Sequence, residues 1–156
     1  MNFLIPDAIV PAPLFLATNR DDAIRELVCS LFKAGVLAET DQPDIVRAIL
    51  RREQLGTTGI GRNIAIPHSR HAAVTKLTGA LAVSGPGIGF ESVDGEPVHV
   101  MILLISPPDR PGEHLRCLES VVSTLRDESL VLAIRAARTR DEILAIVANH
   151  KPGGGP

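Results

Sequence analysis

The most informative stretch of this sequence is Gly56-Thr57-Thr58-Gly59-Ile60-Gly61-Arg62-Asn63-Ile64-Ala65-Ile66-Pro67-His68. Its glycines and threonines predict a polar loop, and Ile64-Ala65-Ile66 predicts a short apolar strand. Pro67 ends that strand, because proline cannot donate to a sheet ladder. His68 follows at once, held between a strand and a stiff proline. Its imidazole changes charge near neutral pH, which suits it to nucleophilic chemistry.

Length and composition restrict the class of protein. The 156 residues can bury one core, so we expect a single domain over residues 1–150 and a disordered tail over 151–156. Four Phe with no Trp or Tyr leave few platforms for stacking on single-stranded nucleic acid, and the net charge of −2 gives no nucleic-acid footprint. No apolar run is long enough for membrane insertion and no signal peptide is evident, so we expect a cytoplasmic protein.

The predicted elements run in the order two helices, then a group of strands, then the remaining helices. Helical spacing of apolar residues is found in five segments: 21–34, 41–53, 112–125, 129–137 and a last helix that opens with the capping box 139–142. Extended segments are predicted at 12–16, 64–66, 77–84, 88–90 and 98–105, with turns at 85–87 and 93–96. Residues 98–105 are apolar on both pleat faces apart from the start of the run, where His99 interrupts it, and this is typical of a central strand covered by helices on both sides. We therefore predict an α/β fold with a single mixed β-sheet and helices packed on both faces.

The glycine-rich loop does not match the common nucleotide-binding or hydrolase motifs. A Walker loop needs Gly-Lys-Ser/Thr before a helix, whereas these glycines lead into a strand and lack the third glycine of a dinucleotide fingerprint. No Gly-x-Ser-x-Gly elbow of a hydrolase is present. The loop instead offers backbone N–H groups and the hydroxyls of Thr57 and Thr58, a combination that can bind an oxyanion. Arg51, Arg52 and Arg62 lie close in sequence and could neutralise one.

The sequence contexts of the histidines predict different roles for them. Taken alone, His68 reads as a solvent-facing loop residue, and its setting is what favours a reactive role. His114 follows the loop that leaves the central strand, where α/β folds place ligands, so the two rings could share one pocket. His71 has no Cys or acidic partner at ligand spacing, so we predict a solvated loop residue and neither a metal site nor another cofactor. His99 is expected to be structural.

The run from Gly59 to His68 closely resembles the active-site signature of the enzyme IIA component of the bacterial phosphoenolpyruvate-dependent phosphotransferase system. The resemblance is to its fructose–mannitol class, which includes the nitrogen-related regulatory enzyme IIA. Three further segments extend it over roughly residues 5 to 149: Arg52-Glu53, Phe90 to Val98, and Glu113-His114-Leu115. Two positions depart from the family's pattern. Ser69 stands where a small residue without a hydroxyl is usual, and Arg62 stands where a small or polar residue is usual.

The resemblance implies a phosphoryl carrier. It implies that His68 accepts the group from a phosphohistidine of the small histidine phosphocarrier protein. By the same resemblance, His114 lies beside it, Arg52 lies near the phosphoryl oxygens and Thr58 is a hydroxyl donor. Transfer between two histidines joins states of similar energy, so positioning and charge stabilisation dominate the chemistry.

Three functions of a protein with this fold stay open at this point. A relay would pass the phosphoryl group to a cysteine of an enzyme IIB domain for sugar uptake. A regulator would bind or release target proteins according to its phosphorylation state. The sequence carries no attached IIB or membrane portion, which favours regulation. The third alternative is a non-catalytic binding module of the same fold, which the presence of all the reacting groups disfavours.

Overall fold

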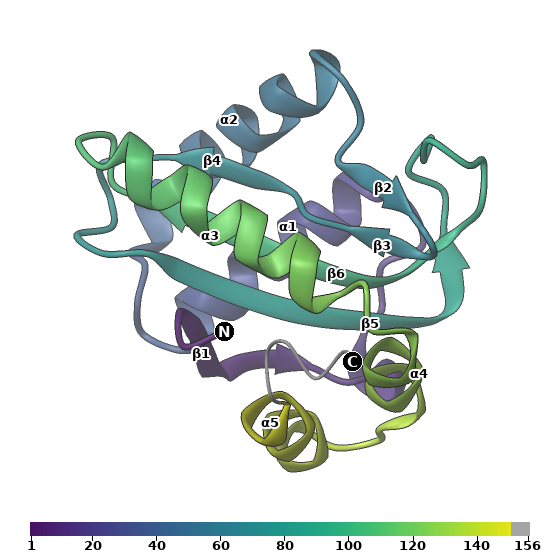
Figure 1. Ribbon diagram of the computed structural model, residues 1–156. Coiled ribbons are helices and arrows are strands. Elements are labelled where there is room, and N and C mark those ends of the chain that lie inside the picture. Colours follow the sequence, from purple (N-terminus) through teal and green to yellow (C-terminus); the bar gives the residue numbers. More distant parts are fainter. Residues whose placement is uncertain (151–156) are drawn as a thin grey trace.

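The computed structural model describes residues 1–150, so the predicted tail over residues 151–156 lies outside the described residues. The described chain forms one six-stranded sheet (Figure 1). Its order is β1 (Leu4–Val10), β5 (Thr78–Ile88), β6 (Val98–Ser106), β3 (Ile64–Ala65) and β2 (Gly59–Gly61), while β4 (His68–Arg70) also pairs with β6. β5 is antiparallel to β6, whereas β3 and β4 are parallel to it and β1 is parallel to β5. The sheet is therefore mixed, as predicted.

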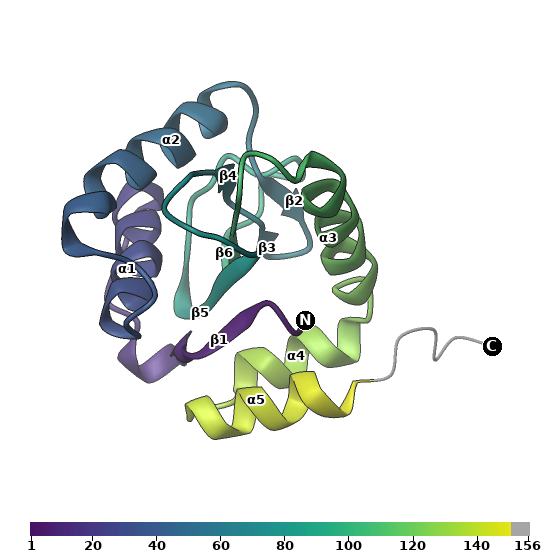
Figure 2. The same ribbon diagram turned by 90° about the vertical axis from the view of Figure 1, so that its left-hand side faces the viewer.

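Helices cover both faces of this sheet (Figure 2). One layer consists of α1 (Arg20–Lys33) and α2 (Gln42–Gln54), and the other of α3 (Pro111–Thr124), α4 (Glu128–Ala136) and α5 (Arg140–Asn149). Short 3-10 turns lie at Ala12–Leu14 and Glu39–Asp41. None of the helices within residues 1–150 has the length and apolar character needed to cross a bilayer.

β6 explains why the sheet is covered twice. Alternate side chains of β6 enter two different cores: Met101, Leu103 and Ile105 pack with α1 and α2, and Val100, Ile102 and Leu104 pack with α3, α4 and α5. All six side chains are fully buried. Successive strand residues point to opposite faces, so a strand between two helix layers must be apolar at every position. The prediction of a central strand is confirmed.

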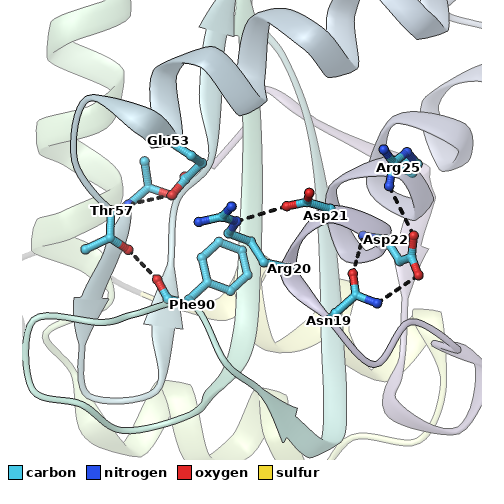
Figure 3. A network of polar contacts seen from close by, with 9 residues as sticks. Asn19, Arg20, Asp21, Asp22, Arg25, Glu53, Thr57 and Phe90 are labelled. Atoms are coloured by element: carbon cyan, nitrogen blue, oxygen red, sulfur yellow. Dashed lines mark hydrogen bonds and ion pairs between the residues drawn. The ribbon is translucent and has the colours of Figure 1, made fainter.

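Local caps set the helix starts. Asn19 accepts a hydrogen bond from the Asp22 backbone N–H at 2.9 Å and begins α1 (Figure 3). Thr139 accepts from the Glu142 N–H at 3.1 Å and begins α5. The capping box at 139–142 was predicted, and both caps form because Asn and Thr side chains can satisfy N–H groups that the first turn leaves free. α1 ends at Lys33, and Gly35 just beyond it adopts a φ of 83°, in the left-handed region that favours glycine.

Two strand predictions were wrong. The first strand is Leu4–Val10, and residues 12–16 contain a 3-10 turn instead. Pro11 precedes that turn and Pro13 lies within it, and proline supplies no N–H for a ladder. β5 continues through Gly85-Pro86-Gly87, where a turn was expected. Pairing with β6 is irregular between Val83 and Ile88, and this irregularity accommodates the proline.

Candidate functional site

The stretch before His68 folds as a hairpin followed by a strand. β2 and β3 pair antiparallel, and Arg62 and Asn63 join them with positive φ angles of 58° and 68°. Two residues with positive φ fit the tight turns that match the twist of a hairpin. Residues 59–61 are therefore a strand, where a loop was expected.

Pro67 then separates two short strands that both follow β6. Its carbonyl accepts the Leu104 N–H at 3.0 Å, so the pairing bridges the proline. His68 opens β4 opposite Leu104, so it is a strand residue and not the loop residue that its sequence suggested when taken alone. The strand holds the backbone of His68 more firmly than a free loop would.

The topology brings His68 and His114 together. β4 runs parallel to β6, so both strands end at the same edge of the sheet. A short loop leads from Ser106 at the end of β6 to α3, which carries His114 in its first turn. The two ring centroids lie 5.4 Å apart, with planes inclined by 57°. The prediction that the two rings share one pocket is confirmed.

A cleft of about 670 Å³ opens over β4 between the two helix layers, whose helices α2 and α3 flank this strand in Figure 2. Its lining residues are Ala48, Arg51, Arg52, Leu55, His68, Ser69, Arg70, Pro111 and His114. The lining contains three arginines and no carboxylate. Within residues 1–150 none of these arginines forms an ion pair. A concave surface with unpaired cations attracts an anion.

The arginines near the glycine-rich stretch have separate roles. The half-buried Arg52 donates from Nη1 to the Gly56 carbonyl at 2.8 Å, which holds its guanidinium at the cleft wall. Arg62, expected to neutralise the same anion, does not line the cleft, so that expectation was wrong. Its backbone N–H donates to Asp94 at 2.9 Å, and its Nη2 donates to the Arg126 carbonyl at 2.6 Å.

The hydrogen bond of His68 defines which nitrogen can react. Its Nδ1 lies 2.8 Å from the Ile66 carbonyl oxygen. A carbonyl only accepts, so Nδ1 carries the hydrogen of the neutral ring and Nε2 keeps its lone pair. Burial lowers the pKa of His68, and the positive charge of Arg52 lowers it further, while the bond to Ile66 and the Glu53 carboxylate oppose them. The neutral, nucleophilic form is favoured at neutral pH.

His114 is also kept neutral. Burial, the charge that His68 carries when protonated and the positive charge of Arg70 together lower the pKa of His114 to about 4, and burial is the largest of these causes. Its Nδ1 is hydrogen-bonded to the hydroxyl of Ser106. The sequence did not single out Arg70 or Ser106. The available signal for Arg70 was its position two residues after His68, on the same face of a strand that had not been recognised.

Thr57 and Thr58 have hydrogen-bond partners inside the protein. The Thr57 hydroxyl donates to the Phe90 carbonyl at 2.6 Å (Figure 3). The Thr58 N–H donates to the Glu53 carboxylate at 3.1 Å, and its hydroxyl donates to the other oxygen of that carboxylate. Glu53 and Thr58 are each only 4% exposed, and neither lines the cleft. This pair fastens the end of α2 to the start of the hairpin.

His71 is not the solvated residue that was expected. Its Nε2 lies 2.5 Å from an oxygen of Asp44, and its Nδ1 accepts the Ala73 N–H at 3.0 Å. The hydrogen bond from His71 lowers the pKa of Asp44. The contact ties the end of β4 to the first turn of α2, so it supports the cleft from outside. Asp44 lies 27 residues earlier, which is why sequence spacing did not reveal it.

Comparisons with known proteins agree with this geometry. The family described as phosphoenolpyruvate-dependent sugar phosphotransferase system, EIIA 2, matches residues 13–150. A nitrogen regulatory protein of Bradyrhizobium diazoefficiens is 33% identical over 147 residues, which cover 94% of this chain and 93% of that protein. The 2-O-alpha-mannosyl-D-glycerate-specific EIIABC component of Escherichia coli is 35% identical over 141 residues, which cover 89% of this chain. The match spans only 21% of that longer protein.

Solved structures show the same fold. The nitrogen regulatory protein IIA-Ntr of Neisseria meningitidis superimposes with a TM-score of 0.82 at 29% identity, covering 94% of this chain and 97% of that one. The mannitol enzyme IIA of Escherichia coli, solved in complex with phosphorylated enzyme IIB, gives a TM-score of 0.74 at 24% identity. That match covers 92% of this chain and 96% of the other.

Proposed function

The chain belongs to the type 2 enzyme IIA family of the phosphoenolpyruvate-dependent sugar phosphotransferase system, and we propose that His68 is the residue on which it carries the phosphoryl group. It is thus a phosphotransferase component rather than a complete enzyme. The observation that carries the assignment is the orientation of the His68 ring. Its Nδ1–H is engaged by Ile66, which leaves the Nε2 lone pair as the nucleophile in an arginine-lined cleft.

The proposed step is a direct transfer of the phosphoryl group from one imidazole to another. Nε2 of His68 attacks the phosphorus of a phosphohistidine on the histidine phosphocarrier protein. A new N–P bond forms, the donor's N–P bond breaks, and its electron pair returns to the donor imidazole. Charge in this loose transition state spreads over the three equatorial phosphoryl oxygens, so catalysis depends on positioning and on cations.

Arg52 and His114 supply charge and hydrogen bonds to those oxygens in this proposal. Arg52 is held at the cleft wall by Gly56, and the His114 ring lies 5.4 Å from His68. Removing one such donor typically costs about 3 kcal/mol of barrier. A hydroxyl contact from Thr58 stays a prediction, and it would require the threonine to leave its present bond to Glu53.

For the output we propose phosphorylation-dependent regulation of target proteins in the cytoplasm, without nucleic-acid binding or membrane insertion. The support is the nitrogen regulatory relative, which this chain matches over nearly the whole length of both proteins. Relay to an enzyme IIB cysteine for sugar uptake is the second candidate. Its support is the mannitol enzyme IIA that was solved with phosphorylated enzyme IIB.

Intact-mass spectrometry tests the His68 assignment. The protein is mixed with phosphoenolpyruvate, enzyme I and the phosphocarrier protein. We expect the wild type to gain one phosphoryl group that is lost in acid, and His68→Gln to gain none, because glutamine offers no nucleophilic nitrogen. His99→Gln is the matched control, since its ring bonds to the Ser84 carbonyl and does not line the cleft.

Normal labelling of His68→Gln would refute the assignment. An unlabelled wild type, beside a labelled enzyme IIA known to be competent, would instead favour the non-catalytic binding module. Adding an enzyme IIB domain then separates the two outputs, because only a relay loses its phosphoryl group to the IIB cysteine.

A further inference from the structure

Within residues 1–150 the Ser106 side chain makes one hydrogen bond, and its partner is His114, which lines the cleft. It is the last residue of β6, and none of its surface is exposed. Its hydroxyl is hydrogen-bonded to Nδ1 of His114, and within residues 1–150 the hydroxyl has no second partner. Its backbone is fixed as well, because the Ser106 carbonyl accepts the His71 N–H at 2.9 Å. The hydroxyl is therefore a fixed point against which the His114 ring is set.

The direction of this hydrogen bond follows from the burial. A hydroxyl can donate or accept, and Nδ1 can do either. If Ser106 accepted, its own hydrogen would be buried without an acceptor, which costs about 1–3 kcal/mol. If Ser106 donates, the hydroxyl hydrogen and the Nδ1 lone pair are both satisfied. The hydrogen of the neutral His114 ring must then lie on Nε2.

We propose that Ser106 is a positioning residue that holds His114 in its Nε2–H tautomer, so that this N–H donates to the phosphoryl group on His68. The inference rests on the proposed function of His68. It gives the two rings opposite tautomers, His68 with Nδ1–H and His114 with Nε2–H. One ring thereby presents a lone pair to phosphorus and the other presents a hydrogen to the phosphoryl oxygens.

The opposite tautomer of His114 would work against transfer. It would turn the Nε2 lone pair toward oxygens that carry negative charge in the transition state. Because burial and the neighbouring cations keep His114 neutral, protonation does not supply the missing hydrogen. The donor at the phosphoryl group therefore depends on which nitrogen Ser106 leaves free.

Nitrogen-15 NMR reads the tautomer of each histidine in the wild-type protein. Three rings serve as internal references, because the partner of each Nδ1 defines the tautomer. Nδ1 of His68 and Nδ1 of His99 each face a backbone carbonyl, which only accepts, whereas Nδ1 of His71 accepts the Ala73 N–H. We expect the Nδ1–H form for the first two and the Nε2–H form for His71 and His114. Finding His114 as Nδ1–H in the wild type would overturn the inference.

Ser106→Ala tests the consequence for transfer. We expect His114 alone to lose its single tautomer, and phosphorylation by the phosphocarrier protein to slow about tenfold, as expected for loss of one hydrogen bond. Ser106→Thr keeps the hydroxyl and should restore both readouts. Ser92→Ala is the matched control, because Ser92 is also buried but its hydroxyl has no hydrogen-bond partner within residues 1–150. Thermal unfolding checks that each variant is folded.

The double variant separates positioning from general loss of structure. If Ser106 acts only through His114, Ser106→Ala should slow a His114→Ala protein no further. Wild-type rate in Ser106→Ala with an unchanged His114 tautomer would overturn the inference and leave the proposed function standing. A wild type that accepts no phosphoryl group would instead refute the proposed function, while the tautomer assignment remained measurable.

Discussion

The turn between β2 and β3 lies only a few residues along the chain from the cleft over β4 (Figure 1). The arginines of the two regions nevertheless have different surroundings. At the turn, the backbone N–H of Arg62 and its guanidinium each have a protein acceptor. In the cleft, Arg52 has one carbonyl acceptor, and Arg51 and Arg70 have no ion-pair partner within residues 1–150. The guanidiniums of Arg52 and Arg62 each donate to one backbone carbonyl, but only that of Arg52 lies in the cleft wall, where an anion can reach its remaining N–H groups.

The difference shows that nearness in sequence to the reactive histidine does not define a functional arginine. Arg62 is six residues from His68 but lies at the far end of a hairpin. Arg70 faces the same cleft as His68, and its charge lowers the pKa of His114. A cation matters for transfer only if the fold places it in the cleft with N–H groups to spare, and a guanidinium that makes one bond keeps further donors for an anion. The same substitution at Arg52 in the cleft and at Arg62 in the turn tests this rule.

The largest effect is expected for Arg52→Gln. We expect single-turnover phosphorylation by the phosphocarrier protein to slow about 100-fold, because the phosphoryl oxygens lose a cation in the transition state. The free energy of unfolding should fall by only about 1 kcal/mol, through the lost bond to the Gly56 carbonyl. Rapid-quench labelling and urea unfolding measure the two quantities. An unchanged rate would remove Arg52 from the site.

A smaller effect, on stability, is expected from the pKa of His114. Its pKa falls from an ordinary 6.5 to about 4 in the folded protein. Between these values the unfolded chain binds the proton and the folded chain does not, so the free energy of unfolding falls as pH falls from 6.5 toward 4. His114→Gln should flatten this dependence, and His68, whose pKa is also lowered, should retain part of it.

Urea midpoints of the wild type and of His114→Gln, measured across that pH range, provide the comparison. Parallel curves for the two proteins would mean that the fold does not keep His114 neutral. The role assigned to its Nε2–H would then need another basis.

The smallest effect is expected for Arg62→Gln. Losing the 2.6 Å bond to the Arg126 carbonyl should lower the free energy of unfolding by about 1 kcal/mol. The phosphorylation rate should stay within twofold or so of the wild type, since Arg62 does not line the cleft. A loss of rate like that of Arg52→Gln would show that the turn also binds the donor protein, and it would remove the contrast between the turn and the cleft.

The fold was largely predictable where a pattern is local. Asn19 and Thr139 begin helices through bonds that span three residues, and the apolar run from Val100 to Ile105 indicates that β6 lies between two helix layers. The errors fall where pairing is long-range. β4 is three polar or charged residues that form a strand because β6 lies beside them, and β5 runs through Pro86 because its pairing with β6 resumes afterwards.

For the candidate site, the sequence by itself pointed to His68, His114 and Arg52, because a proline-bounded histidine, a strand-end loop and a known family pattern are all readable along one chain. Only the tertiary structure decided which neighbours these residues have. It placed Arg70 in the cleft and Arg62 outside it, and it directed the Thr58 hydroxyl to Glu53. It also placed the buried Ser106 hydroxyl on His114. Periodicity and caps act over a few residues, whereas hydrogen bonds and charges act between groups that only strand pairing brings together.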